Sequence, residues 1–142
     1  MPHKISPRLL EIVNALPLKN GVRVLEIGCG TGVAAREIAK RAGSGKVLAI
    51  DRSSKAIEQA TILSQVEINN GALQFLQVKV EELALPEDES PYDFAFAIRV
   101  GAMDGRHPES GQTAIKNIKA VLKKDGKMYI DGGSPLKEVN LY

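Results

Sequence analysis

The 142-residue sequence predicts an α/β fold built on a mostly parallel sheet. Short apolar runs, such as residues 24–27, alternate with longer segments in which apolar residues recur at helical spacing, as in residues 33–42. Between these two segments lies a turn with glycines at positions 28, 30 and 32. A strand that leads through glycines into a helix is typical of a ligand site at the carboxyl end of that strand.

The composition is that of a globular protein and excludes several functional classes. Hydrophobic residues make up 44% of the chain and charged residues 25%, which is ordinary for one domain. The formal net charge of +2 and the aromatic content of 4% do not support nucleic-acid binding. No apolar run reaches the roughly 18 residues of a membrane span, and the N-terminus lacks the apolar core of a signal peptide, so we expect no membrane association and a cytoplasmic location. With a single cysteine we expect neither a disulfide nor a metal centre.

We expect a single domain over residues 1–142, with a leading helix in residues 1–20, a core in 21–131 and a tail in 132–142. Ser6 is the predicted N-cap of the leading helix and Pro7 lies in its first turn. The predicted helices cover residues 7–16, 33–42, 54–69 and 110–124, and the predicted strands cover residues 22–27, 46–51, 73–80, 92–98 and 127–130.

The glycine turn is the predicted ligand site. Side chains at Gly28, Gly30 or Gly32 would hold a ligand away from the backbone, and the free N–H groups at the start of the next helix favour a carboxylate or a phosphate. A dinucleotide fingerprint requires a third glycine at position 33, where this chain has Val33, so a nicotinamide cofactor is disfavoured. Cys29 is interpreted as a small residue between glycines rather than as a nucleophile.

Asp51 is the second candidate ligand residue, because it ends the predicted second strand about 20 residues after the glycine turn. A carboxylate only accepts hydrogen bonds, and it can take both hydroxyls of a ribose. The alternative role for Asp51 is an N-cap of the following helix, for which Ser53 is the better candidate. Arg52 is interpreted either as a cation lying along an adenine face or as a solvated surface charge.

The motif VLEIGCGTG in residues 24–32 resembles the first motif of the class I S-adenosylmethionine-dependent methyltransferases. This resemblance implies a doubly wound, Rossmann-like sheet with the strand order 3-2-1-4-5 and S-adenosylmethionine as cofactor. It also implies that Glu26 and the glycine turn hold the methionine part of the cofactor and that Asp51 holds the ribose. The Tyr92-Asp93 pair and the run VLKKDGKMYI in residues 121–130 are similar to further segments of the family.

The sequence departs from the family's pattern after the third strand. There the family has an aspartate that reads the adenine amino group, whereas this chain has Lys79, a cation that only donates hydrogen bonds. The role of the aspartate therefore does not carry over. The backbone N–H of Val80 and the carboxylate of Glu81 are the candidates for adenine binding, and Arg99 is the candidate for the remaining cofactor surface.

The loop after the fourth strand, in residues 99–108, is expected to face the transferable methyl group, because ligands lie outside the carboxyl ends of parallel strands. Asp104, Arg106 and His107 are the candidates for contact with the methyl acceptor. His107 is either a general base or part of a His-Pro turn. The motifs of nucleic-acid methylases are missing from the sequence, which favours a small-molecule acceptor.

Only 12 residues follow Ile130, too few for a crossover and a further parallel strand. Class I methyltransferases normally add two more strands, so we expect a sheet that lacks them and ends at the fifth strand. An exposed strand edge is a pairing site, so we expect a homodimer or a partner chain at residues 127–130.

Three functions are open at this point. The leading hypothesis is methyl transfer from S-adenosylmethionine to a small-molecule acceptor, catalysed mainly by placing the acceptor in line with the methyl group. The second is a non-enzymatic module that binds the cofactor or a partner. The third is a nicotinamide oxidoreductase, which Val33 disfavours.

Overall fold

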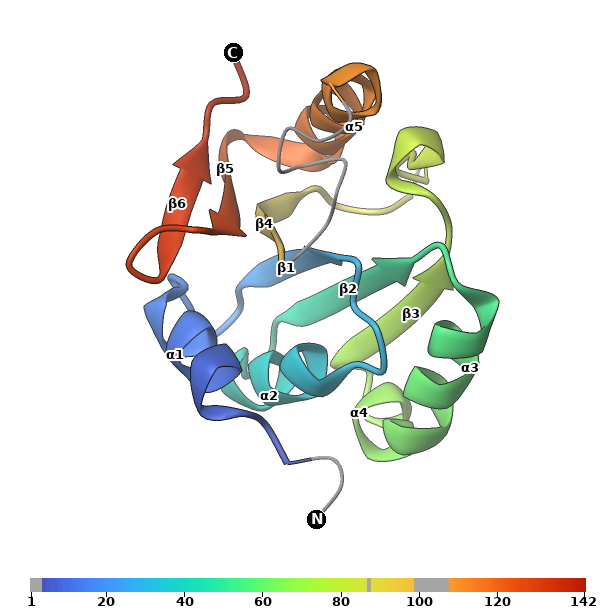
Figure 1. The fold of residues 1–142 in the computed structure, drawn as a ribbon. Helices are drawn as coiled ribbons and strands as arrows, with labels where there is room; N and C mark the ends of the chain where they lie inside the picture. Colours follow the sequence, from blue (N-terminus) through green and yellow to red (C-terminus); the bar gives the residue numbers. More distant parts are fainter. Residues whose placement is uncertain (1–3, 87, 99–107) are drawn as a thin grey trace.

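The computed structural model describes residues 4–86, 88–98 and 108–142 (Figure 1). These residues form a six-stranded sheet with the order β3-β2-β1-β4-β5-β6. Strands β1 to β5 run parallel to one another, and β6 is antiparallel to β5. The predicted order 3-2-1-4-5 is therefore confirmed, with one more strand beyond it. The strands are β1 (Arg23–Ile27), β2 (Lys46–Asp51), β3 (Leu73–Gln77), β4 (Tyr92–Ala97), β5 (Leu122–Asp131) and β6 (Leu136–Val139).

Helices cover both faces of this sheet. Figure 1 shows α1, α2, α3 and α4 on one side and α5 on the other. None of the helices in the described ranges has the length and apolar character that a membrane span requires. The helices are α1 (Pro7–Ala15), α2 (Val33–Arg41), α3 (Ser54–Leu63), α4 (Gln65–Asn69), the 3₁₀ helix η1 (Val80–Glu82) and α5 (Pro108–Val121).

The hydrophobic core consists of two clusters, one on each face of the sheet. Successive residues of a strand point to opposite faces, so Val24 packs with Val13 of α1 and Ile38 of α2. Its neighbour Leu25 packs with Ile118 of α5 on the other face. All five of these strand and helix residues are at most 1% exposed. The sheet is thus buried on both faces, as parallel sheets require.

The prediction that β5 is an exposed edge is wrong, because β6 covers it. Met128 pairs with Val139 and Ile130 pairs with Lys137. The shortage of chain after Ile130 applies only to a parallel strand, which needs a long crossover, whereas an antiparallel strand needs a turn. The tail also contributes Leu141, which is 8% exposed and packs in the cluster around α5. The homodimer or partner interface expected at residues 127–130 therefore loses its structural basis.

Several predicted elements differ from the structure in their extent. The helix expected over residues 110–124 is α5 (Pro108–Val121), and the strand expected over residues 127–130 is β5 (Leu122–Asp131), which includes residues 122–124 of the expected helix. The helix expected over residues 54–69 is broken into α3 and α4 at Ser64, which is fully buried. The third strand ends at Gln77, and Val80 begins η1. The predicted start of α1 is confirmed, because the hydroxyl of Ser6 accepts a hydrogen bond from the N–H of Leu9 at 3.2 Å.

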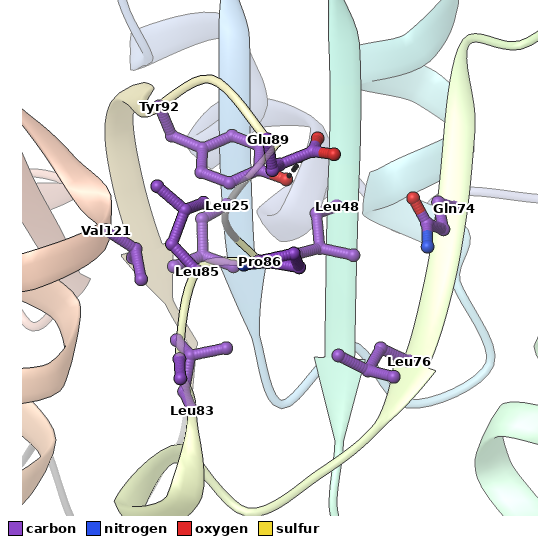
Figure 2. A pocket seen from close by; sticks show the side chains of 11 residues that line it. Leu25, Leu48, Gln74, Leu76, Leu83, Leu85, Pro86, Glu89, Tyr92 and Val121 are labelled. Carbon is purple, nitrogen blue, oxygen red and sulfur yellow. Dashed lines mark hydrogen bonds between the residues drawn. The ribbon is translucent and has the colours of Figure 1, made fainter.

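A small pocket lies on the α5 side of the sheet, where residues 83–86 rather than a helix cover the strands (Figure 2). Leu25 of β1 and Leu48 of β2 line it together with Leu85 and Tyr92. No predicted site residue is among the residues that line this pocket. It is therefore separate from the site that the glycine turn indicates.

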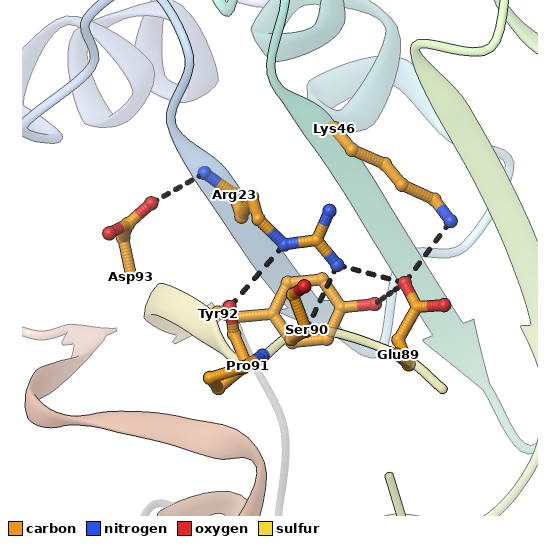
Figure 3. Close-up of polar contacts among 7 residues, drawn as sticks. All are labelled: Arg23, Lys46, Glu89, Ser90, Pro91, Tyr92 and Asp93. Carbon is orange, nitrogen blue, oxygen red and sulfur yellow. Dashed lines mark hydrogen bonds and ion pairs between the residues drawn. The ribbon is translucent and has the colours of Figure 1, made fainter. Parts of the chain in front are cut away.

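A cluster of charged and aromatic side chains joins the starts of β1, β2 and β4 (Figure 3). The guanidinium of Arg23 donates to Oε1 of Glu89 at 2.8 Å and lies 5.0 Å above the ring of Tyr92. The same Glu89 oxygen accepts from Nζ of Lys46 at 3.2 Å and from the hydroxyl of Tyr92 at 3.3 Å. The hydrogen bond from Arg23 holds the pKa of Glu89 below its ordinary value of 4.5. Glu89 thus fastens the segment before β4 to the sheet.

We expect Glu89→Gln to lower the free energy of unfolding by about 1 kcal/mol at neutral pH, because Arg23 and Lys46 lose their shared ionic partner. Because the pKa of Glu89 is lower in the folded state than its ordinary value of 4.5, ionised Glu89 stabilises the fold above pH 4.5. This stabilisation is lost as the pH falls through the folded-state pKa and the carboxylate is protonated. The difference in urea unfolding between parent and variant should therefore be smaller at about pH 3 than at neutral pH. Glu58→Gln on the exposed side of α3 is the control, and an equal difference at both pH values would contradict the role of Glu89.

Candidate functional site

The candidate site lies at the carboxyl ends of β1 and β2, where the glycine turn leaves the sheet. The N–H groups of Gly28 and Cys29 both donate to the carbonyl oxygen of Ile50, at 2.8 and 3.0 Å. The N–H of Gly30 donates to Oδ2 of Asp51 at 2.9 Å. The turn therefore crosses the end of β2 and places the first two predicted ligand segments side by side.

The backbone of this turn requires glycine at three positions. Gly28, Gly30 and Gly32 have φ values of 73°, 56° and 85°, in the left-handed region that other residues rarely adopt. A Cβ at Gly32 would also lie 2.8 Å from Cζ of Phe75. A Cβ at Gly30 would meet nothing within 4 Å, so the space beside Gly30 is open. This open space is where the backbone can be approached by a ligand.

The start of α2 offers free hydrogen-bond donors beside the turn. Gly32 is the N-cap residue, and no side chain caps the helix. The first intrahelical bond to the N-cap comes from Arg36, whose N–H donates to the carbonyl of Gly32 at 2.9 Å. The N–H groups of residues 33–35 therefore have no partner within the helix, and together with the helix dipole they favour an anionic group.

Glu26 is buried next to this turn with an unused acceptor. Its side chain is 4% exposed, and Oε1 has no hydrogen-bond partner among the described residues. Burial, and secondarily the negative charge of Asp51, raises the pKa of Glu26 to about 8. Because buried polar atoms are almost always hydrogen-bonded, the free oxygen indicates a place for a donor or a cation from a ligand.

Asp51 has both carboxylate oxygens engaged and can still accept more. Oδ2 accepts from Gly30, and Oδ1 accepts from the N–H of Ser53 at 2.9 Å. Each oxygen retains a second acceptor position, which is enough for two hydroxyl groups. The alternative role as a helix cap belongs to Ser53, whose hydroxyl accepts from the N–H of Ala56 at 3.1 Å. Arg52 is exposed, and its carbonyl accepts from the side chain of Gln77 at 3.3 Å.

The segment after β3 reaches the same edge of the sheet. The N–H of Val78 donates to the carbonyl of Asp51 at 3.1 Å, which brings η1 beside the site. Val80 is 7% exposed and packs in the cluster around α5, while Lys79 is exposed. Glu81 is half-buried. The candidates for adenine binding are therefore adjacent to the candidate for ribose binding, and Lys79 points to solvent.

Asn117 of α5 holds η1 in this place, and the sequence reasoning missed it. Its side-chain nitrogen donates to the carbonyls of Val80 and Glu81, at 3.1 and 2.7 Å. Asn117 follows Ala114 by three residues and precedes Ile118, so it lies on the apolar side of its helix. The sequence signal for this contact is a polar side chain on the apolar face of the predicted helix, where it needs a hydrogen-bond partner.

Cys29 is a buried thiol rather than an activated nucleophile. Its side chain is 7% exposed. Burial, followed by the charges of Glu26 and Asp51, raises the pKa of the Cys29 thiol far above its ordinary range. The geometry therefore supports the interpretation of Cys29 as a small residue within the turn. Of the remaining predicted residues, Arg99, Asp104, Arg106 and His107 lie outside the described residues.

Comparison with known proteins agrees with this arrangement. A family model described as a methyltransferase domain matches residues 24–126. A fungal O-methyltransferase from Aspergillus nomiae is 33% identical over 134 residues, which is 91% of this chain and 56% of the relative. The chain thus spans about half the length of the curated relatives it matches.

Two solved structures share the fold. The S-adenosylmethionine-dependent methyltransferase from Thiobacillus denitrificans, in complex with S-adenosylhomocysteine, has a TM-score of 0.69 at 20% identity, over 90% of this chain and 48% of the other. The [4+2]-cyclase SpnF has a TM-score of 0.71 at 26% identity, over 87% of this chain and 43% of the other. With the matched family model and the glycine turn, these findings show that the chain belongs to the class I S-adenosylmethionine-dependent methyltransferase family.

Proposed function

We propose that this chain binds S-adenosylmethionine and transfers its methyl group to a small-molecule acceptor. The observation that carries the proposal is that the site has both a hydrogen-bond acceptor and a set of hydrogen-bond donors that are not in use. Among the described residues, Glu26 has a buried oxygen without a donor, and the first N–H groups of α2 have no acceptor within the helix and no side-chain cap. The methionine part of the cofactor carries an ammonium and a carboxylate, so it can supply a partner to each of them.

The other predicted residues extend this site toward the nucleoside. Asp51 would accept from the ribose hydroxyls, since both of its oxygens keep an acceptor position. The backbone of Val80 and the carboxylate of Glu81 would contact the adenine edge, with Arg52 on one adenine face and Arg99 on the remaining cofactor surface. The support for Val80 and Glu81 is their position on η1, which the bond between Val78 and Asp51 brings to the ribose candidate.

Binding and orientation are the tasks of this chain in the reaction. The cofactor, when bound, supplies an electrophilic methyl group, so catalysis needs an acceptor held in line with it more than it needs a base. Asp104, Arg106 and His107 remain the predicted contacts of the acceptor. The O-methyltransferase among the relatives supports an oxygen nucleophile on a small molecule.

The second candidate function is a non-enzymatic module that binds the cofactor or a partner. Lys79, in the position where the family has an acceptor for the adenine amino group, favours this candidate. Methyl transfer to any acceptor would exclude this candidate. Family membership and Val33 argue against a nicotinamide oxidoreductase.

Assembly and location are separate proposals. With β5 covered, a second chain that pairs with the sheet would have to use the outer edge of β3 or β6. The edge strand β6 is short and carries exposed Lys137 and Glu138, which discourage pairing. We therefore expect any homodimer to use a surface other than the β6 edge, and light scattering that shows a monomer at micromolar concentration would exclude the homodimer. The cytoplasmic location stays a prediction.

Calorimetry with S-adenosylmethionine, S-adenosylhomocysteine and NAD tests the proposed cofactor. We expect binding of the first two and none of NAD. Asp51→Ala should weaken binding about tenfold or more, since it removes charge-assisted hydrogen bonds. Gly30→Val should abolish binding, because its side chain fills the open space and strains a backbone with a φ of 56°. Glu58→Gln is the unaffected control, and preferential binding of NAD would overturn the proposal.

The protonation of Glu26 makes cofactor binding depend on pH. The free carboxyl has a pKa of about 8, so it is mostly protonated at pH 6 to 7.5, and pairing with an ammonium requires it to lose its proton. The affinity for S-adenosylhomocysteine should therefore rise with pH in this range, by up to about tenfold per pH unit.

Calorimetry in buffers of different ionisation enthalpy measures this proton release directly. At about pH 7 we expect the parent to release close to one proton for each ligand bound. The Glu26→Gln variant should not release this proton, because glutamine has no carboxyl group. Equal proton release by the parent and the variant would show that Glu26 does not pair with the ligand.

A further inference from the structure

We propose that Arg36 is a positioning residue that holds the end of the glycine turn in its binding conformation by joining it to the break between α3 and α4. The inference deepens the proposed function and rests on it. Arg36 touches neither Glu26 nor Asp51 through any hydrogen bond in the described structure, so its effect on a ligand would pass through the turn.

One nitrogen of Arg36 bridges two segments that are far apart in sequence. Arg36 lies in the first helical turns of α2, where long side chains point back toward the helix start. Its Nη1 donates to the carbonyl of Thr31 at 2.7 Å and to the hydroxyl of Ser64 at 2.9 Å. The glycine turn is thereby attached to the residue at which α3 ends and α4 begins.

The bond to Thr31 fixes the plane of the peptide that leads into α2. In a trans peptide the carbonyl of Thr31 and the N–H of Gly32 point in opposite directions. Arg36 donates to the carbonyl of Thr31, and the N–H of Gly32 donates to the carbonyl of Cys29 at 3.0 Å. A turn with three glycines has little conformational preference of its own, so these contacts supply the restraint that the missing side chains do not.

The other end of the bridge is equally constrained. Ser64 is fully buried, and its hydroxyl would lose its charged donor without Arg36. Phe75 of β3 lies next to Gly32, since a Cβ built on Gly32 would be 2.8 Å from Cζ of Phe75. A rotation of the Thr31–Gly32 peptide would have to break its bond with Arg36 or its bond with Cys29.

The position of Arg36 costs folding free energy, because one of its nitrogens is buried without a hydrogen-bond partner among the described residues. Nη2 of Arg36 is buried and has no hydrogen-bond partner in the described part of the chain. Burial also lowers the pKa of the Arg36 guanidinium, against which the charge of Glu67 acts. The half-buried Arg36 guanidinium thus leaves one nitrogen unsatisfied, while its other terminal nitrogen bonds Thr31 of the ligand turn and Ser64.

Arg36→Met and Ser64→Ala test this inference, with Arg41→Met as the matched control. Arg41 lies on the same helix and hydrogen-bonds Glu37 and Asn14, but it does not contact the turn. We expect Arg36→Met to weaken S-adenosylhomocysteine binding about tenfold, Ser64→Ala to weaken it less, and Arg41→Met to leave it unchanged. Arg36→Lys, which retains a charged donor, should restore part of the affinity.

Amide hydrogen exchange without ligand separates positioning from general stability. In Arg36→Met, the amide of Gly32 should exchange faster, while that of Met128 in β5 should exchange as in the parent. Unchanged exchange at Gly32, or ligand affinity within twofold of the parent in Arg36→Met, would overturn the inference. If the parent does not bind S-adenosylhomocysteine, the proposed function fails, and exchange at Gly32 still decides whether Arg36 holds the turn.

Discussion

The structure depends on the carbonyl oxygen of Ile50, which accepts hydrogen bonds from the N–H groups of both Gly28 and Cys29. This double acceptance forces the chain to turn directly after β1 and to cross the end of β2. Only glycine tolerates the resulting backbone angles. The turn then brings Gly30 to the carboxylate of Asp51 and leaves the start of α2 without a cap. The candidate site follows from this one crossing.

The two ends of the sheet differ in how their polar groups are used: those at the strand starts bond one another, and those at the carboxyl ends form the candidate ligand site. At the starts of the strands, Arg23, Lys46 and Tyr92 all contact the carboxylate of Glu89. At the carboxyl ends, within the part of the chain that the structure describes, Glu26 has a buried oxygen without a donor, and the first N–H groups of α2 have neither a helical acceptor nor a side-chain cap. Unused polar groups cost folding free energy, so their gathering at one end is what a ligand site requires.

Much of the fold could be predicted because it is encoded locally. The caps at Ser6 and Ser53 agree with the structure, since capping depends on residues close in sequence. The strand order 3-2-1-4-5, which the resemblance to the methyltransferase family implied, also agrees. The edge at β5 was predicted wrongly, because the length of the tail was judged for a parallel strand while β6 is antiparallel. The break at Ser64 was missed, because no glycine or proline marks it.

The sequence by itself determined the glycine turn and the family to which the chain belongs, and it made Glu26 and Asp51 the candidate ligand residues, because spacing along one strand–turn–helix–strand segment suffices to find them. Only the tertiary structure decided what holds that unit in position. Arg36 reaches Ser64 across 28 residues of sequence, and Asn117 reaches Val80 across 37. Such contacts depend on how helices pack against the sheet, and no local pattern records which distant carbonyl or hydroxyl a buried donor will meet.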